Sequence, residues 1–161
     1  MTTINAARRA FLKRRIGPAN IDHHMPWAVA AFVDLCQRCD DCIRACEPSV
    51  VVRGDGGFPT VDFDRGGCTF CGACAEACGH GALERRPGPA WRLKAAIGDN
   101  CLSAQGITCR ACGDACEARA IRFRLQLGGR ALPGVDPALC NGCGACVAIC
   151  PTRVIQIQEA A

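Results

Sequence analysis

Residues 140–151 read CNGCGACVAICP, and the spacing of their four cysteines decides the fold. The pattern is C-x2-C-x2-C-x3-C followed by proline, and it recurs without the proline in residues 36–46 and 68–78. A fourth group has the same C-x2-C-x3-C ending, but seven residues separate its first two cysteines. The sixteen cysteines are Cys36, Cys39, Cys42 and Cys46; Cys68, Cys71, Cys74 and Cys78; Cys101, Cys109, Cys112 and Cys116; and Cys140, Cys143, Cys146 and Cys150.

This spacing favours iron–sulfur clusters over zinc sites or disulfides. Three cysteines two residues apart on a tight loop can reach three irons of one 4Fe–4S cubane, and we expect the fourth at the start of a helix, facing away. Zinc sites use C-x2-C pairs separated by a longer stretch, and disulfides between cysteines so close in sequence are strained. Gly72, Gly142 and Gly144 lie inside the loops, where they permit positive φ and close approach of N–H groups to sulfur.

The composition agrees with a chain held together by its cysteines. Its 161 residues include two Trp, six Phe and no Tyr, so few large side chains are available for a core. The formal net charge is +4, but four oxidised clusters with their thiolates would bring it to about −4. Because most of the arginines are scattered, we expect them to offset cluster charge, and we expect no nucleic-acid partner.

The segments between the cysteine runs show an internal duplication. Residues 46–68 and 116–140 each open with Cys-Glu, continue into β-branched residues and turn at glycines. Apolar and polar side chains alternate from 121 to 127, which predicts a strand with one buried face, and residues 154–157 also look like a strand. Each half therefore reads as loop, short helix, hairpin, loop, short helix, and the predicted fold class is α+β.

Three parts of the chain follow from this pattern. Residues 1–35 form a basic N-terminal segment, residues 36–88 a first two-cluster unit, and residues 89–161 a second two-cluster unit with an extended first cysteine spacing. Residues 86–91, RPGPAW, are a linker by composition, and Trp91 is expected to act as an apolar plug at the junction.

Each unit is similar to a bacterial-type two-cluster ferredoxin, in which the fourth cysteine of one run ligates the other cluster. That resemblance implies four ligand sets. Whether Cys101 is a ligand stays open, because seven residues separate it from Cys109. The four sets are Cys36, Cys39, Cys42 and Cys78 for cluster one; Cys68, Cys71, Cys74 and Cys46 for cluster two; Cys101, Cys109, Cys112 and Cys150 for cluster three; and Cys140, Cys143, Cys146 and Cys116 for cluster four.

The N-terminal segment contains RRAFLK at residues 8–13, which resembles a twin-arginine export signal. Such a signal needs an apolar stretch behind the arginines, and none follows here. We expect instead a short basic amphipathic helix that stops at Gly17-Pro18, docks a partner and does not insert stably into a membrane. His23-His24 is expected to be an exposed polar pair rather than a metal site.

The chain as a whole resembles the NapF family, the ferredoxin-type accessory proteins of the periplasmic nitrate reductase system. The matching stretches are RRAFLKRR at 8–15, Pro26-Trp27, 36–47, Arg53-Gly54, 57–59, Ala90-Trp91, 97–99, 109–124 and 140–146. This resemblance implies a cytoplasmic protein with four 4Fe–4S clusters. It also implies binding to the precursor of the reductase's catalytic subunit, and a role in that subunit's maturation and cluster assembly before export.

One other function remains open on sequence grounds. An electron-transfer polyferredoxin that relays electrons to a reductase would need the same clusters. An enzyme is not expected, because the sequence has no nucleophile–base pair, glycine-rich phosphate loop or second cofactor motif. Residues 54–57, GDGG, are expected to form a hairpin turn, since no helix follows them.

Overall fold

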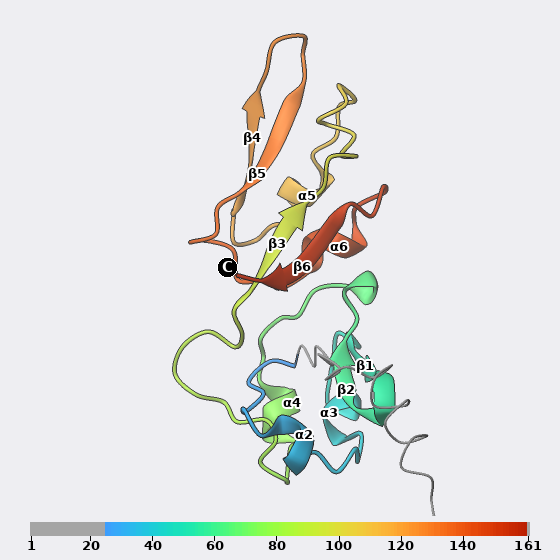
Figure 1. The fold of residues 1–161 in the computed structure, drawn as a ribbon, viewed down its shortest axis with the longest axis vertical. Helices are drawn as coiled ribbons and strands as arrows, with labels where there is room; N and C mark the ends of the chain where they lie inside the picture. The colour runs from blue at the N-terminus through green and yellow to red at the C-terminus, as the bar shows by residue number, and fades with distance from the viewer. Residues whose placement is uncertain (1–24, 161) are drawn as a thin grey trace, which may run out of the picture.

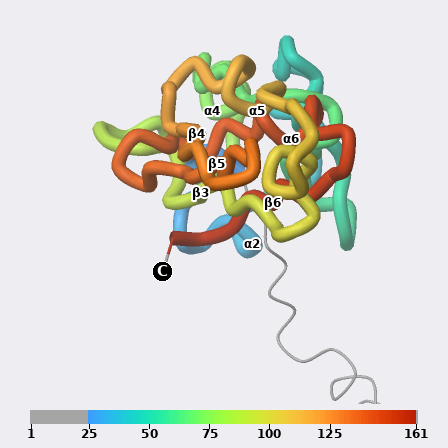
Figure 2. Tube along the Cα trace, turned by 90° about the horizontal axis from the view of Figure 1, so that it is seen from above, coloured from blue at the N-terminus to red at the C-terminus, as the bar shows by residue number. Residues whose placement is uncertain are grey.

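The structure, a computed structural model, describes residues 25–160. The predicted basic helix, the RRAFLK stretch and His23-His24 lie outside the described residues. The described chain forms two units of short helices and two-stranded sheets, stacked along the long axis of the molecule (Figure 1). Seen from above in Figure 2, the second unit lies over the first. This mixed helix and strand content is compatible with the predicted α+β class.

The first unit places a hairpin between two short helices. Its elements are α2 (Phe32–Leu35), α3 (Asp41–Arg44), β1 (Val51–Arg53), η1 (Asp55–Gly57), β2 (Pro59–Val61), η2 (Phe63–Arg65) and α4 (Ala73–Glu76). Strands β1 and β2 are antiparallel, with Val51 opposite Val61. The turn between them uses Gly56 and Gly57, both at positive φ, so residues 54–57 form the predicted hairpin turn.

The second unit repeats this order and adds a second sheet. Its elements are β3 (Leu93–Ile97), α5 (Ala111–Asp114), β4 (Ile121–Leu125), β5 (Ala131–Val135), α6 (Ala145–Ala148) and β6 (Ile155–Glu159). The predicted strand at 154–157 is confirmed as β6, which pairs antiparallel with β3. Strand β3 was not predicted, because its sequence LKAAI has no alternating pattern to mark it.

The predicted buried face of β4 is wrong over its second half. Ile121 is 8% exposed, but Leu125 is 85% exposed and Leu127, just beyond the strand, is 93% exposed. The hairpin of β4 and β5 is longer than the body against which it packs, and it projects beyond the rest of the second unit (Figure 1). The alternation therefore describes a buried face only where Ile121 meets the core.

Each unit has a small core in which cysteines make up a large share of the apolar contacts. In the first unit Cys42 and Cys74 pack with Phe32, Val50 and Phe58, and in the second Cys112 and Cys146 pack with Ile121 and Ile155. The few large side chains found in the sequence are therefore supplemented by the cysteines themselves. None of the helices formed by residues 25–160 has the length and apolar character needed to span a bilayer.

Candidate metal centres

The third cysteine of each run lies inside a short helix, and the fourth follows the end of that helix. Cys42, for example, lies in α3, and Cys46 comes two residues after its last residue, Arg44. The expectation that the fourth cysteine begins a helix is therefore wrong. The three residues between the third and fourth cysteines themselves form one helical turn, so the fourth cysteine can only follow the helix.

The loops of the three regular runs share an unusual backbone conformation on either side of their second cysteine. The residues concerned are Arg38 and Asp40, Phe70 and Gly72, and Gly142 and Gly144, with φ between 54° and 90°. This includes the three glycines expected to have positive φ. In the stretched run Arg110, after Cys109, has a φ of −134°. The seven-residue gap thus gives the third site a loop of different shape.

Three cavities are each lined by four cysteines drawn from two runs. Site one is lined by Cys36, Cys39, Cys42 and Cys78. Site three is lined by Cys101, Cys109, Cys112 and Cys150, and site four by Cys116, Cys140, Cys143 and Cys146. The cavities measure 340, 340 and 320 Å³ with their open mouths included. Their similar size and identical donor sets point to the same kind of occupant in each.

Site two comprises Cys46, Cys68, Cys71 and Cys74. Burial raises the pKa of Cys74 to about 12, and the negative charge of Cys68, Cys42, Cys46 and Cys71 adds to the effect. Burial likewise raises the pKa of Cys68, and its neighbours Cys46, Cys71 and Cys143 contribute in the same direction. The charge of Cys46 therefore acts on cysteines of the following run, and Cys46 does not line the cavity of site one.

The third cysteines share a raised pKa, which is about 11 for Cys42 and Cys112 and about 12 for Cys146, as for Cys74. Burial is the main cause, and neighbouring cysteine thiolates add to it. Four thiolates in one such place therefore require a positively charged partner. Within residues 25–160 no three Cys, His, Asp or Glu side chains converge on a point suited to one metal ion. The cysteines line cavity walls instead, and a 4Fe–4S core has both the positive charge and the size for that arrangement.

Backbone N–H groups donate hydrogen bonds to three of the sulfurs. Phe70 donates to Cys68 Sγ at 3.4 Å, Ala95 to Cys140 Sγ at 3.4 Å, and Ala120 to Cys116 Sγ at 3.3 Å. Such bonds stabilise negative charge on sulfur and help to set the reduction potential of a bound cluster. The Ala95 bond gives β3, which the sequence pattern missed, a direct role at site four.

The four sites follow one another in a line. The charge of Cys42 of site one helps to raise the pKa of Cys74 of site two, and that of Cys112 of site three helps to raise the pKa of Cys146 of site four. Helix α3 packs against α4, as α5 does against α6. Sites two and four meet across the unit boundary, where Cys68 N–H donates to the carbonyl of Cys143 at 2.7 Å. The spatial order is therefore one, two, four, three.

Trp91 lies at that boundary, as expected for the junction. Its ring makes edge contacts with Phe63 and Phe70 of the first unit at centroid distances of 5.8 and 5.4 Å. Its indole N–H donates to the carbonyl of Asn141 in the second unit at 2.9 Å. The side chain thus packs as an apolar plug. It links the loops of sites two and four, because its ring packs on Phe70 of one loop and its N–H bonds to Asn141 of the other.

The extra residues between Cys101 and Cys109 are attached to the β4–β5 hairpin through Ser103. Ser103 is 4% exposed, and its hydroxyl donates a hydrogen bond to the carbonyl of Ala131 at 2.6 Å. The N–H of Ala131 donates in return to the carbonyl of Ser103 at 3.3 Å. This attachment holds the loop that follows Cys101, which is itself 9% exposed, beside the cavity of site three. Sequence spacing alone left the role of Cys101 open.

Replacing Ser103 with Ala should destabilise site three. The change leaves the half-buried carbonyl of Ala131 without its side-chain donor, and we expect a loss of about 1 kcal/mol in local stability. The rate of bleaching of visible absorbance in guanidinium checks this. Ser49→Ala is the matched control, because its hydroxyl bond to Glu47 is long and exposed. Equal bleaching rates for the two variants would contradict the role given to Ser103.

Comparison with known proteins identifies the family. Residues 35–82 and 107–154 match the 4Fe-4S dicluster domain. The chain is 45% identical over 157 residues to the ferredoxin-type protein NapF of Escherichia coli, covering 96% of each chain. It is 42% identical over 171 residues to NapF of Haemophilus influenzae, with 99% of this chain and 97% of that protein covered. A methylamine utilization ferredoxin-type protein, MauM of Methylorubrum extorquens, is 34% identical over 74% of this chain and 62% of its own.

The second dicluster match begins at residue 107 and so leaves out Cys101, which the structure nevertheless places in the wall of site three. All the other cysteines of the four sites fall inside the two matched segments. With two 4Fe–4S dicluster segments and nearly full-length similarity to NapF proteins, the chain belongs to the NapF family of ferredoxin-type iron–sulfur proteins.

Proposed function

We propose that the protein holds four 4Fe–4S clusters, one at each of sites one to four, with the cysteines of each site as ligands. For three sites the support is geometric, since three separate cavities of similar size are each lined by four cysteines; for site two it is that the charges of Cys46, Cys68 and Cys71 act on the buried Cys74. The fourth cysteine of each run lies with the cysteines of its partner run in every set. We further propose that the three parts 1–35, 36–88 and 89–161 act as docking segment, first unit and second unit.

A bound 4Fe–4S cluster supplies one-electron chemistry at a potential that its surroundings set. The chain contributes the surroundings. Its third cysteines are buried, its N–H groups donate to Cys68, Cys116 and Cys140, and its apolar side chains, such as Phe32 and Leu83 at site one, limit the access of water. These features stabilise the thiolates and tune the potential.

The function we favour is assistance to another iron–sulfur protein. We propose that this protein works in the cytoplasm, is not itself an enzyme, and helps to mature the catalytic subunit of the periplasmic nitrate reductase before that subunit is exported. The observation that carries this proposal is the similarity to NapF proteins over 96% of the chain, which includes the segment before the first cysteine run that a simple electron carrier does not need.

Deleting residues 1–20 should abolish binding to the catalytic subunit's precursor and leave the iron content unchanged. The segment carries five basic residues between positions 8 and 15, whereas the cysteines all lie beyond it. An anaerobic pull-down from cytoplasm with the full-length and shortened proteins measures the binding. A full-length variant in which those five residues are replaced by Gln separates the effect of charge from that of chain length. Undiminished binding by the shortened protein would refute the docking role.

Electron relay is the second candidate, and the linear order of the sites favours it. Sites two and four are joined by the hydrogen bond from Cys68 to Cys143. The charges of Cys42 and Cys112 act on the third cysteines of sites two and four. The two functions differ in the state of the precursor when this protein is absent. Assistance in maturation predicts that the precursor then lacks its iron–sulfur centre, while relay predicts an intact centre and slow reduction. The iron content of the precursor, purified from cells that lack this protein, distinguishes them.

A further inference from the structure

Strand β4 has one unpaired edge. Asp136 N–H donates to the carbonyl of Ala120 and Gln126 N–H to the carbonyl of Arg130, both at 2.8 Å, so the even-numbered residues of β4 face β5. In an antiparallel pair the residues between them direct their N–H and C=O groups the other way. Those of Phe123 and Leu125 have no hydrogen-bond partner within residues 25–160, and neither residue is buried as Ile121 is. An edge of this kind can accept a further strand.

The opposite edge of the hairpin is closed. On β5, the outward N–H and C=O of Ala131 are both bonded to Ser103, and the next outward position is Pro133, which has no N–H to offer. The two edges of the hairpin therefore differ in their hydrogen bonding. The edge of β5 is covered by the loop of site three and interrupted by Pro133, whereas the outward groups of β4 are unpaired among the described residues.

The two faces of β4 also differ in kind. On one face the side chains of Arg122 and Arg124 are exposed, next to Leu132 of β5. On the other face Phe123 and Leu125, together with Ile107, line a hollow of 840 Å³, including its open mouth, between the hairpin and the loop before Cys109. Leu125 and Ile107 are 85% and 53% exposed. A strand added at this edge would meet Arg122 and Arg124 on one face, and on the other the apolar side chains of the hollow, where the guanidinium of Arg110 lies 5.3 Å from the centre of the Phe123 ring.

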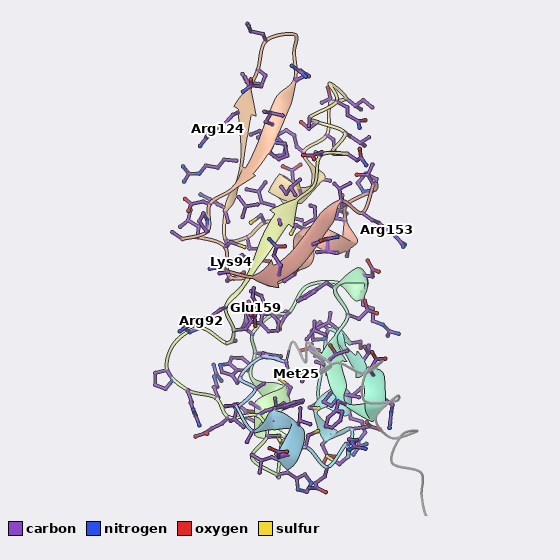
Figure 3. All side chains as sticks on the ribbon, viewed as in Figure 1. Met25, Arg92, Lys94, Arg124, Arg153 and Glu159 are labelled. Atoms are coloured by element: carbon purple, nitrogen blue, oxygen red, sulfur yellow. The ribbon has the colours of Figure 1, made fainter. Side chains whose placement is uncertain are left out.

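The charge of the hairpin is unbalanced. Residues 118–135 include four arginines, Arg119, Arg122, Arg124 and Arg130, and no acidic residue. None of the four takes part in an ion pair among the described residues, whereas Arg53 in the hairpin of the first unit is paired with Asp40. Figure 3 shows Arg124 extending beside the hairpin, away from Arg153 on the other side of the unit. The second hairpin thus presents positive charge that the described chain does not neutralise.

We propose that the free edge of β4 binds an extended segment of a partner polypeptide in which acidic and apolar side chains alternate. The acidic side chains would face Arg122 and Arg124, and the apolar ones would enter the hollow beside Phe123 and Leu125. A second copy of β4 is excluded, because pairing two such strands would oppose arginine to arginine. The chain's own basic residues 8–15 carry the wrong sign as well.

The proposed surface lies next to site three, the last in the line of sites. Cys109 lines both the hollow and the cavity of site three. A segment bound at β4 would therefore hold its parent protein beside that site. This inference stands apart from the docking role of the N-terminal residues, because it rests on a different surface and on no particular partner.

A synthetic peptide tests the proposal on the cluster-loaded protein. The probe is a fluorescein-labelled nine-residue peptide of alternating Glu and Val, and its binding is followed by fluorescence anisotropy. We expect saturable binding that Arg122→Glu combined with Arg124→Glu weakens by about tenfold or more, while Arg153→Glu changes it less than about twofold. Leu125→Pro, which removes an outward N–H, should weaken binding more than Leu125→Ala, which keeps it.

Two forms of the peptide separate strand addition from simple charge attraction. N-methylation of the residues whose N–H groups would face β4 should abolish binding, and N-methylation of the alternate residues should preserve it. The proposal would be overturned if neither N-methylated form lost binding, or if the parent peptide did not bind. The arginines would then be charged side chains that prevent edge-to-edge aggregation of β4. The proposal also fails if the peptide does not bind and the protein instead sediments with phosphatidylglycerol vesicles through Leu127, because the surface would then be one for membranes.

Discussion

Replacing Cys46 with Ala should cost the protein the cluster of site two and leave that of site one in place. The reason is that the charge of Cys46 acts on Cys68 and Cys74, while the cavity of the preceding run is completed by Cys78. If each run held a cluster by itself, the same substitution would remove the cluster of Cys36, Cys39 and Cys42. We expect iron and acid-labile sulfide to fall by about a quarter.

Combining Cys46→Ala with variants that already lack one site shows which cluster it removes. This holds even if a site with three cysteines keeps some of its iron. A parent carrying Cys68→Ala and Cys71→Ala cannot hold a cluster at site two, so adding Cys46→Ala should change its iron content little. Adding Cys46→Ala to a parent carrying Cys36→Ala and Cys39→Ala should instead remove a second cluster, taking the loss to about half of the iron. The reverse result would show that Cys46 serves its own run.

The sequence indicated that the first three cysteines of a run lie close together because their spacing constrains a short loop and one helical turn. Such a constraint is local, whereas the exchange of fourth cysteines between runs came from the resemblance to two-cluster ferredoxins and stays a prediction. The hairpin turn at Gly56 and Gly57 was predictable because it too is local. The hairpin turn depends on adjacent residues, whereas Cys36 and Cys78, which line one cavity, are 42 positions apart in the sequence but belong to the same unit.

The features that the sequence did not reveal depend on contacts between distant segments. Strand β3 exists because Leu93–Ile97 pairs with β6, some sixty residues later, and nothing in LKAAI marks it as a strand. Cys101 joins site three because Ser103 is fixed to Ala131 of the hairpin. The exposure of Leu125 reflects the reach of the hairpin beyond the body. An alternating pattern indicates a strand, but it does not say where the core ends.

The meeting of sites two and four is a contact of this distant kind, and Gly144→Ala should break it. Gly144 follows Cys143, whose carbonyl accepts the N–H of Cys68, and a Cβ at residue 144 would overlap the ring of Phe63. Phe63 is held in turn by Trp91, so its ring has little room to move. Overpacking of this kind costs about 1–3 kcal/mol. The positive φ of Gly144 adds about 1–2 kcal/mol for any other residue.

Gly128→Ala is the matched control for the backbone part of that cost. Gly128 has a φ of 79°, close to the 81° of Gly144, but a Cβ there would meet nothing within 4 Å. The two variants share the conformational penalty and differ in the clash. Because unfolding with cluster loss is irreversible, the measurement is the rate of bleaching of visible absorbance in guanidinium. Gly144→Ala should bleach markedly faster than Gly128→Ala.

The same pair of variants tests whether the two units depend on each other. If the contact of Gly144 with Phe63 is what brings sites two and four together, Gly144→Ala should also slow the exchange of electrons between the two halves of the protein, and Gly128→Ala should not. Equal bleaching rates and equal exchange rates in the two variants would mean that the loops of sites two and four do not pack as the structure describes. Faster bleaching with unchanged exchange would mean that another path links the units, because the clash would then destabilise the fold without separating the sites.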